Sequence, residues 1–205
     1  MKQQPGGGTR TLVLFDFDGT LIRTDSFIIV AKRLCGIRRF LWGCLRVSPW
    51  LTAWKLNMIA GGAAKERLFK ALYGGMSAEK FTQGCRSLAG ELAGYGNEGM
   101  IKVLRRHQRM GSRVIIVSAS VGEWVRPVAE VLGVGEVIAT EAEVDGDGRM
   151  TGRFSTPNCN GEEKVRRIRE YLGDELAGYE AVEAYGDREG DEAMIQLSRP
   201  ATVNR

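Results

Sequence analysis

The stretch that decides the fold is TLVLFDFDGT, residues 11–20. Its first part is apolar and β-branched, which is typical of a short strand buried on both faces of a parallel sheet. The run ends in Asp16 and Asp18, and Gly19 follows them as a turn residue. Open α/β sheets form their ligand crevices at such strand ends, so we expect both carboxylates to face a crevice. Taken alone, the segment is also compatible with two solvated turn aspartates.

Short apolar runs and helical patterns alternate along the rest of the chain. Strands are expected at residues 112–120, 136–140 and 181–185. Helices are expected at residues 97–110, 121–132, 161–173 and 189–197. This alternation predicts an α/β fold with a doubly wound parallel sheet. A β-hairpin is expected beside it, turned at the Asp-Gly pairs from Asp145 to Gly148.

An inserted helical unit is predicted between the first two strands. Residues 21–111 separate those strands, a stretch far longer than one crossover helix requires. Its first helix is expected to present one apolar face, and further helices are expected at residues 51–59, 64–73 and 77–93. The apolar face comprises Phe27, Ala31, Leu34, Ile37, Leu41 and Leu45.

The length and composition fit a single globular unit with an insert. The chain has 205 residues, of which 43% are hydrophobic and 26% are charged, close to the values of ordinary globular domains. Residues 11–21 and 97–205 are predicted to form the α/β core, and residues 22–96 a helical cap domain. The glycine-rich residues 1–10 are expected to be a flexible tail, because they offer nothing to bury.

Positive charge is concentrated in the predicted cap. The net charge is +4, but residues 22–60 alone carry seven basic side chains and one acidic side chain, giving +6. Because the excess is local, we predict no nucleic-acid partner. Residues 27–59, with Trp42, Trp50 and Trp54 among arginines, could contact a membrane surface. Packing of these apolar side chains inside the cap is the preferred interpretation.

The sequence favours a cytoplasmic protein without zinc, disulfides or a catalytic triad. It has no basic-then-apolar leader and no uncharged run long enough to span a bilayer. The four cysteines are scattered without a C-x-x-C pair, which disfavours zinc and disulfides. His107 is the only histidine and no G-x-S-x-G element is present, which disfavours a serine or cysteine hydrolase.

A second acidic segment is expected at the same edge of the sheet. The run YGDREGD, residues 185–191, follows the last predicted strand and would bring Asp187 and Asp191 toward Asp16 and Asp18. Four carboxylates so close would repel one another and raise one another's pKa values. Mg²⁺ relieves this repulsion, because it takes carboxylate oxygens together with water and substrate phosphate. The sequence therefore implies Mg²⁺ as a cofactor.

Two further segments offer groups that bind an anion. Ser118 lies at the end of the run VIIVSAS, and the helix expected after it would add free backbone N–H groups. Lys164, in NGEEK at the start of another predicted helix, would supply a cation to a phosphate and to a nucleophilic carboxylate. Alone, Ser118 is better explained as a helix cap and Lys164 as a solvated side chain. Their order and their positions after strands favour a phosphate site.

The ordered set DFDGT, VSAS, GEEKV and GDREGD resembles the haloacid dehalogenase-like (HAD) hydrolase superfamily. Its phosphoserine-phosphatase-like branch, subfamily IB, fits best. The resemblance runs from about Leu12 to Asn204 and includes the stretch TGRFSTPNCNGEEKVRRI. It implies a Rossmann-like core with an inserted helical cap, and a phosphatase reaction.

The resemblance implies a role for each motif. Asp16 matches the nucleophile that forms an aspartyl-phosphate, and Asp18 matches the general acid and base. The metal site of the superfamily maps to Asp16, the backbone carbonyl of Asp18 and Asp187, with Asp191 in support. The phosphate-binding positions map to Ser118, Ala119 and Lys164.

The substrate expected from the resemblance is a small phosphorylated metabolite. A phospho-amino acid would place its amine near Asp25 and its carboxylate near Arg67. Arg188 replaces the small residue of many relatives, and a cation there would favour an anionic substrate. The alternative is a membrane-surface phospholipid phosphatase acting on a monoester such as phosphatidylglycerophosphate, and a non-catalytic binding module is a further alternative. The sequence leaves the oligomeric state open.

Overall fold

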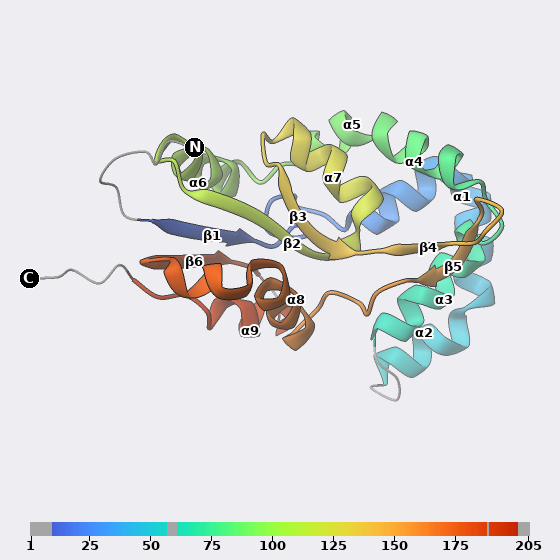
Figure 1. The fold of residues 1–205 in the computed structure, drawn as a ribbon. Helices are drawn as coiled ribbons and strands as arrows, with labels where there is room; N and C mark the ends of the chain where they lie inside the picture. Colours follow the sequence, from blue (N-terminus) through green and yellow to red (C-terminus); the bar gives the residue numbers. More distant parts are fainter. Residues whose placement is uncertain (1–9, 57–60, 188, 201–205) are drawn as a thin grey trace, which may run out of the picture.

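A parallel sheet forms the centre of the molecule (Figure 1). The computed structural model describes residues 10–56, 61–187 and 189–200. The sheet has the strand order β3-β2-β1-β6, and every neighbouring pair is parallel. Its strands are β1 (Thr11–Phe15), β2 (Arg113–Val121), β3 (Glu136–Thr140) and β6 (Ala181–Tyr185). Each lies at a predicted strand, and the predicted α/β class with a doubly wound sheet is confirmed.

Helices cover both faces of this sheet, with α6 and α7 on one side and α8 and α9 on the other (Figure 1). In β1, Phe15 belongs to one hydrophobic core and Leu14 to a second. Successive side chains of a strand point to opposite faces, so an apolar strand must be covered on both. The helices are α6 (Glu98–Arg109), α7 (Gly122–Val131), α8 (Glu162–Leu172) and α9 (Glu192–Ile195). The helix predicted at residues 189–197 is shorter, because a 3₁₀ turn, η2 (Glu189–Asp191), precedes the single turn of α9.

The insert between β1 and β2 is built of helices. They are α1 (Ser26–Arg46), α2 (Ser48–Lys55), α3 (Gly61–Tyr73), α4 (Ala78–Ser87) and α5 (Ala89–Gly94). The helix predicted over residues 77–93 is divided into α4 and α5 at Leu88. Of the helix predicted over residues 51–59, residues 57–59 lie outside the described part of the chain, as do residues 1–9 of the predicted tail.

A hairpin from the second half of the sequence packs against this insert. Its strands β4 (Ala142–Val144) and β5 (Met150–Phe154) are antiparallel, and the predicted turn from Asp145 to Gly148 connects them. The ring of Phe154 lies 5.1 Å from that of Phe69 in α3. The division of the chain into a core and a cap of residues 22–96 stays a prediction.

Helix α1 does not present one continuous apolar face. Gly36, inside the helix, has φ 77° and ψ 154°, so α1 is kinked there. Before the kink Phe27 is buried, whereas Ile37, Leu41 and Leu45 after it are 52%, 58% and 66% exposed. The prediction of a single apolar face along this helix is therefore wrong, because Ile37, Leu41 and Leu45 face outward after the kink.

The cysteines of the chain are free thiols, and none is prepared to act as a nucleophile. Burial raises the pKa of Cys35, Cys44, Cys85 and Cys159 above the usual value, so each stays protonated at neutral pH. In the described ranges, no helix combines the length and the apolar character that crossing a bilayer requires.

Candidate active site

The loop after β1 positions two carboxylates at the edge of the sheet. The N–H of Asp16 donates to the carbonyl of Tyr185 at the end of β6, 2.8 Å away. Gly19 then turns the chain with φ 87°, and its N–H donates to the carbonyl of Ile22 at 2.7 Å. A Cβ at Gly19 would collide with the carboxylate of Asp187, so only glycine lets the two loops approach this closely. The turn therefore brings the loops after β1 and β6 together.

Asp16 shares a buried cation with Asp191. Lys164 Nζ donates to Asp16 Oδ1 at 2.6 Å and also to Asp191 Oδ1. All three residues are buried, and Lys164 is only 1% exposed. A buried charge is tolerated only when partners replace the water that it has lost. The cluster therefore holds the cation of Lys164 within hydrogen-bonding distance of Asp16, the predicted nucleophile.

Burial and neighbouring charges shift the pKa values of this cluster. Burial raises the pKa of Asp16 to about 6, although the Lys164 cation opposes this. Burial by itself would lower the pKa of Lys164, but the carboxylates of Asp16 and Asp191 outweigh it and raise that pKa. At neutral pH Lys164 is therefore a cation and Asp16 an anion, as a nucleophilic carboxylate must be.

Three carboxylates of the site could hold a divalent metal. Oxygens of Asp16, Asp187 and Asp191 lie within 4.8 Å of one another. Asp191 Oδ2 also accepts the N–H of Asp187 at 3.2 Å, which ties these two residues together. Mg²⁺ is usually bound by one or two carboxylates together with water and substrate phosphate oxygens. The donor set therefore fits the cofactor that the sequence implies.

Asp18 lies in a different environment, among hydroxyl groups. Its Oδ1 accepts the N–H of Ser26 at 2.8 Å, and its Oδ2 accepts the hydroxyls of Ser26, at 3.1 Å, and of Ser120. The indole N–H of Trp124 donates to the Ser26 hydroxyl at 2.8 Å. Burial raises the pKa of Asp18, and the Ser120 hydroxyl partly opposes this. The carboxylate of Asp18 is not part of the cluster formed by Asp16, Asp187 and Asp191. The predicted contact of Asp18 with the metal therefore rests on its backbone carbonyl.

The predicted site residues other than Asp187 and Arg67 meet around a cavity of about 90 Å³. It is lined by Asp16, Asp18, Asp25, Lys65, Ser118, Ala119, Asn160, Lys164 and Asp191. Ser118 is buried, and its Oγ accepts the N–H of Ser120 at 3.0 Å, which fixes the hydroxyl at the wall. Lys65 reaches in from α3 and donates to the carbonyl of Ala119 at 2.8 Å. The helical insert thus contributes a cation to the wall of the site.

Comparison with known proteins identifies the family. The sequence model of the haloacid dehalogenase-like hydrolase family matches residues 13–196. The chain belongs to the haloacid dehalogenase-like hydrolase family. Protein CicA of Caulobacter vibrioides is 32% identical over 188 residues, which cover 91% of this chain and 82% of CicA. The histidinol-phosphatase of Neisseria meningitidis is 26% identical, with 95% of this chain and 90% of that protein covered.

Solved structures share the fold of this HAD hydrolase. A protein of unknown function from Bordetella pertussis superposes with a TM-score of 0.74 and 22% identity, covering 93% of this chain and 87% of that one. A phospho-aspartyl intermediate analogue of phosphoserine phosphatase gives a TM-score of 0.65 and 20% identity, covering 93% and 84%. The resemblance to phosphoserine-phosphatase-like HAD proteins is confirmed, with a histidinol-phosphatase and a phosphoserine phosphatase among the relatives, and the chain is an enzyme of the hydrolase class.

In this HAD hydrolase most of the predicted site residues come together, and one does not. Asp25 lines the cavity and also caps α1, since its Oδ1 accepts the N–H of the residue two positions later at 2.9 Å. Arg67 is exposed, and its guanidinium lies 5.1 Å from the centre of the Trp50 ring. It does not line the cavity, so the geometry gives no support to its predicted contact with substrate. Arg188 lies outside the described residues.

Several residues around the site were not predicted. Ser120 follows Ser118 by two positions, and residues so spaced share one face of a strand, so its presence at the site could have been inferred. Ser26, Lys65 and Asn160 lie outside any strand end. No local pattern marks them, because Lys65 and Asn160 reach the cavity, and Ser26 reaches Asp18, only through the folding of the insert and of the loop before α8.

Proposed function

We propose that this chain is a magnesium-dependent phosphatase that hydrolyses a phosphomonoester through an aspartyl-phosphate. The observation that carries the proposal is the contrast between the two carboxylates after β1. Asp16 contacts the cation of Lys164, whereas half-buried Asp18 accepts hydrogen bonds from hydroxyls, and desolvation raises its pKa although the Ser120 hydroxyl opposes this. Neighbouring carboxylates in such different environments suit a nucleophile and a general acid.

The proposed reaction has two steps. In the first, an oxygen of Asp16 bonds to phosphorus while the bond from phosphorus to the ester oxygen breaks, and Asp18 gives its proton to that leaving oxygen. In the second, Asp18 takes a proton from a water molecule whose oxygen attacks phosphorus, and the bond to Asp16 breaks to release phosphate. Lys164 and the cavity-lining residues Ser118 and Ala119 would bind the phosphoryl oxygens in both steps.

The proposed metal site uses Asp16, Asp187 and the backbone carbonyl of Asp18, with Asp191 in support. The clustering of the three carboxylates supports it. When bound, Mg²⁺ would neutralise negative charge shared by the carboxylates and the phosphate. Asp191 is held on one oxygen by Lys164 and on the other by the N–H of Asp187, which suits a residue that orients its neighbours.

We propose a small, soluble phosphomonoester that carries an amine as the substrate. The cavity is small and its wall is polar, with Asp25 as a counter-charge for an amine and Lys65 as a cation beside it. The relatives include a histidinol-phosphatase, and a solved neighbour is a phosphoserine phosphatase. Histidinol phosphate and phosphoserine both carry an amine, so this group is the feature to test first.

A phospholipid monoester is the second candidate substrate. The apolar side chains exposed on α1, such as Leu41 and Trp42, favour a site close to a membrane surface. The polar wall of the cavity favours the soluble substrate instead. Both candidates are compatible with a cytoplasmic enzyme, and the four free thiols support that location.

The test is hydrolysis by the purified protein with Mg²⁺ and with excess chelator. The substrates are an aryl phosphate, phosphoserine, histidinol phosphate and a phospholipid monoester. Asp18→Asn removes the proton acceptor of the second step, but the aryloxide of an aryl phosphate can leave without an acid, so this variant should accumulate protein carrying one phosphoryl group, detected by intact mass. Asp147→Asn, at the exposed hairpin turn, is the matched control and should turn over like the wild type.

Two outcomes would contradict the proposal. Full activity in excess chelator would exclude the metal from the reaction. Wild-type turnover by Asp18→Asn would place the general acid and base at another residue. The rank order of the four substrates then decides between the soluble and the lipid phosphate.

A further inference from the structure

The second half of α1 carries apolar side chains on its outer surface. Its inner face packs against α3, where a Cβ at Gly43 would meet a leucine side chain at 2.9 Å. On the other side Ile37, Leu41 and Leu45 recur at every fourth residue, so they form one stripe along the helix. Trp42, 69% exposed, lies next to this stripe. We call these four residues the outer α1 face.

Positive charge surrounds the outer α1 face. Residues 26–56 contain six basic side chains and no acidic side chain. Arg33 is paired with a glutamate of α5 at 2.7 Å. For Arg38, Arg39 and Arg46 no ion pair is found with any described side chain, so their charge is available to an anionic partner. Large apolar side chains bordered by such cations are typical of a binding surface.

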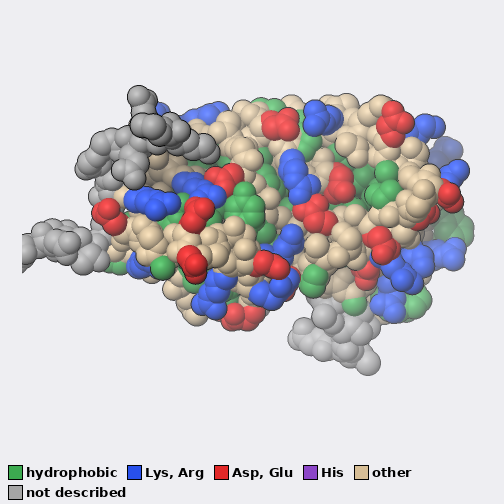
Figure 2. All heavy atoms as spheres, viewed as in Figure 1, with side chains coloured by type: hydrophobic (Ala, Val, Ile, Leu, Met, Phe, Trp, Pro, Cys, Tyr) green, Lys and Arg blue, Asp and Glu red, His purple; other side chains and the backbone are tan. Residues whose placement is uncertain are grey.

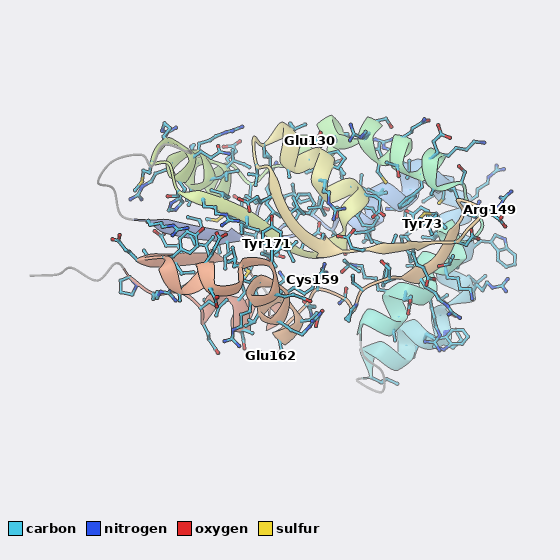
Figure 3. All side chains as sticks on the ribbon, viewed as in Figure 1. Tyr73, Glu130, Arg149, Cys159, Glu162 and Tyr171 are labelled. Atoms are coloured by element: carbon cyan, nitrogen blue, oxygen red, sulfur yellow. The ribbon has the colours of Figure 1, made fainter. Side chains whose placement is uncertain are left out.

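A cationic hollow of about 630 Å³ opens beside this helix. Arg39 of α1, Lys80 of α4 and Arg149 of the hairpin line it, together with a single acidic residue, Asp147. Arg149 lies at the end of the hairpin (Figure 3), where its guanidinium donates to the carbonyl of Gly75 at 3.1 Å. Figure 2 shows Lys, Arg and hydrophobic side chains exposed at this end of the molecule. Three cations against one carboxylate suit a phosphate group.

We propose that the outer α1 face and the cationic hollow dock together on the surface of an anionic lipid bilayer. Leu41, Trp42 and their neighbours would enter the boundary between headgroups and acyl chains, while the arginines stay at the level of the phosphates. The hollow would receive the phosphate of one lipid headgroup. Docking of this kind is peripheral and needs no spanning helix.

Charge complementarity selects a lipid surface over a second copy of this chain. In a two-fold symmetric dimer each patch meets its own copy, so Arg38 and Arg46 would approach the arginines of the other molecule. No acidic residue between positions 26 and 56 is present to pair with them. A bilayer rich in anionic lipid presents negative charge over its whole area and also accepts apolar side chains.

The test is co-sedimentation of the full chain with vesicles of phosphatidylcholine alone, or of phosphatidylcholine with phosphatidylglycerol. We expect about tenfold or more preference for the anionic vesicles, reduced by salt because screening shortens the reach of the arginines. Leu41→Gln with Trp42→Ser should weaken binding about tenfold, and Arg38→Gln with Arg46→Gln should remove the preference. The controls are Met110→Gln, 62% exposed beyond α6, and Lys102→Gln in that helix, which should bind like the wild type.

Docking requires no turnover, so this result is independent of the proposed function. Circular dichroism and urea denaturation establish that the α1 variants remain folded. Failure to sediment with either vesicle, or an equal loss of binding in Met110→Gln, would overturn the proposal. A dimer detected by analytical ultracentrifugation and dissolved by the Leu41 and Trp42 substitutions would assign the face to a second copy and would also overturn it.

Discussion

The active-site edge of the sheet and the outer α1 face distribute their side chains in opposite ways. At the sheet edge charged groups are buried, with Asp16 and Asp191 both bound to Lys164. On α1 apolar groups are exposed, and Leu41 and Trp42 lie in water. Both regions depart from the usual arrangement, in which charges face solvent and large apolar side chains are covered.

The two departures differ in what they require of the fold. A buried charge costs several kcal/mol unless partners replace its water. The sheet edge therefore depends on three separate segments, the loops after β1 and β6 and helix α8, each of which supplies one member of the cluster. An apolar side chain that is exposed in both the folded and the unfolded chain contributes little to stability. Substitutions at the sheet edge should thus change stability or chemistry, whereas those on the α1 face should change only binding.

The largest effect is expected when the charge of Asp16 is removed. Asp16→Asn keeps the shape of the side chain but replaces a nucleophilic carboxylate with an amide, so turnover should fall by about 10⁴-fold or more, roughly 5.4 kcal/mol of barrier. The fold should remain, because burial already disfavours the ionised carboxylate, and a neutral amide carries a smaller desolvation cost. Aryl phosphate hydrolysis with Mg²⁺ measures the loss, and circular dichroism checks the fold. Turnover within about tenfold of the wild type would remove Asp16 from the reaction.

The buried half of this comparison was largely predictable, because its residues follow apolar strands. Asp16, Asp18 and Asp187 come directly after strand runs, and parallel strands end at one edge of a sheet, so their meeting follows from local pattern alone. The hydrogen-bond network that positions Asp18 was not predictable in this way. Ser26 and Trp124 are 98 positions apart, and only the packing of α1 against α7 brings their hydroxyl and indole together.

A smaller effect, on stability, is expected from Lys164→Met. Methionine leaves Asp16 and Asp191 buried side by side without a cation, so the free energy of unfolding should fall by about 3 kcal/mol at neutral pH in the absence of Mg²⁺. The loss should shrink as the pH is lowered, because burial raises the pKa of Asp16 to about 6, and once Asp16 takes up a proton the repulsion from Asp191 ends.

Urea denaturation measures this change, and Lys102→Met, on the exposed surface of α6, is the matched control. The control should stay within about 0.5 kcal/mol of the wild type. A loss below about 1 kcal/mol in Lys164→Met would mean that the cluster is solvated. The contrast between the two regions would then disappear.

The exposed half of the comparison was mispredicted, and the reason lies in one residue. Helical periodicity assumes that every residue advances the helix by the same angle, so the spacing from Phe27 to Leu45 predicted one apolar face. Gly36 interrupts that advance with a backbone conformation that a spacing pattern does not register. The predicted elements were otherwise displaced by only a few residues, except where Leu88 divides one helix into two and where η2 shortens the last helix to α9.

The smallest effect is expected from Gly36→Ala, which tests the origin of the outer α1 face. With φ 77° and ψ 154°, Gly36 occupies a region that side chains with a Cβ rarely enter, so alanine should cost about 1–3 kcal/mol although no atom lies within 4 Å of the added methyl group. Gly90→Ala in α5, also in open space but without a positive φ, should instead gain about 0.5–1 kcal/mol. Urea denaturation compares the two variants.

The outcome for Gly36→Ala shows whether the kink sets the outer α1 face. If Gly36→Ala is destabilised and still sediments with anionic vesicles, the kink persists under strain and the face stays outward. If stability and sedimentation fall together, the helix has straightened and carried Leu41 away from the surface. A Gly36→Ala protein as stable as Gly90→Ala would show that residue 36 is helical in solution, and the outward face of α1 would lose its structural basis.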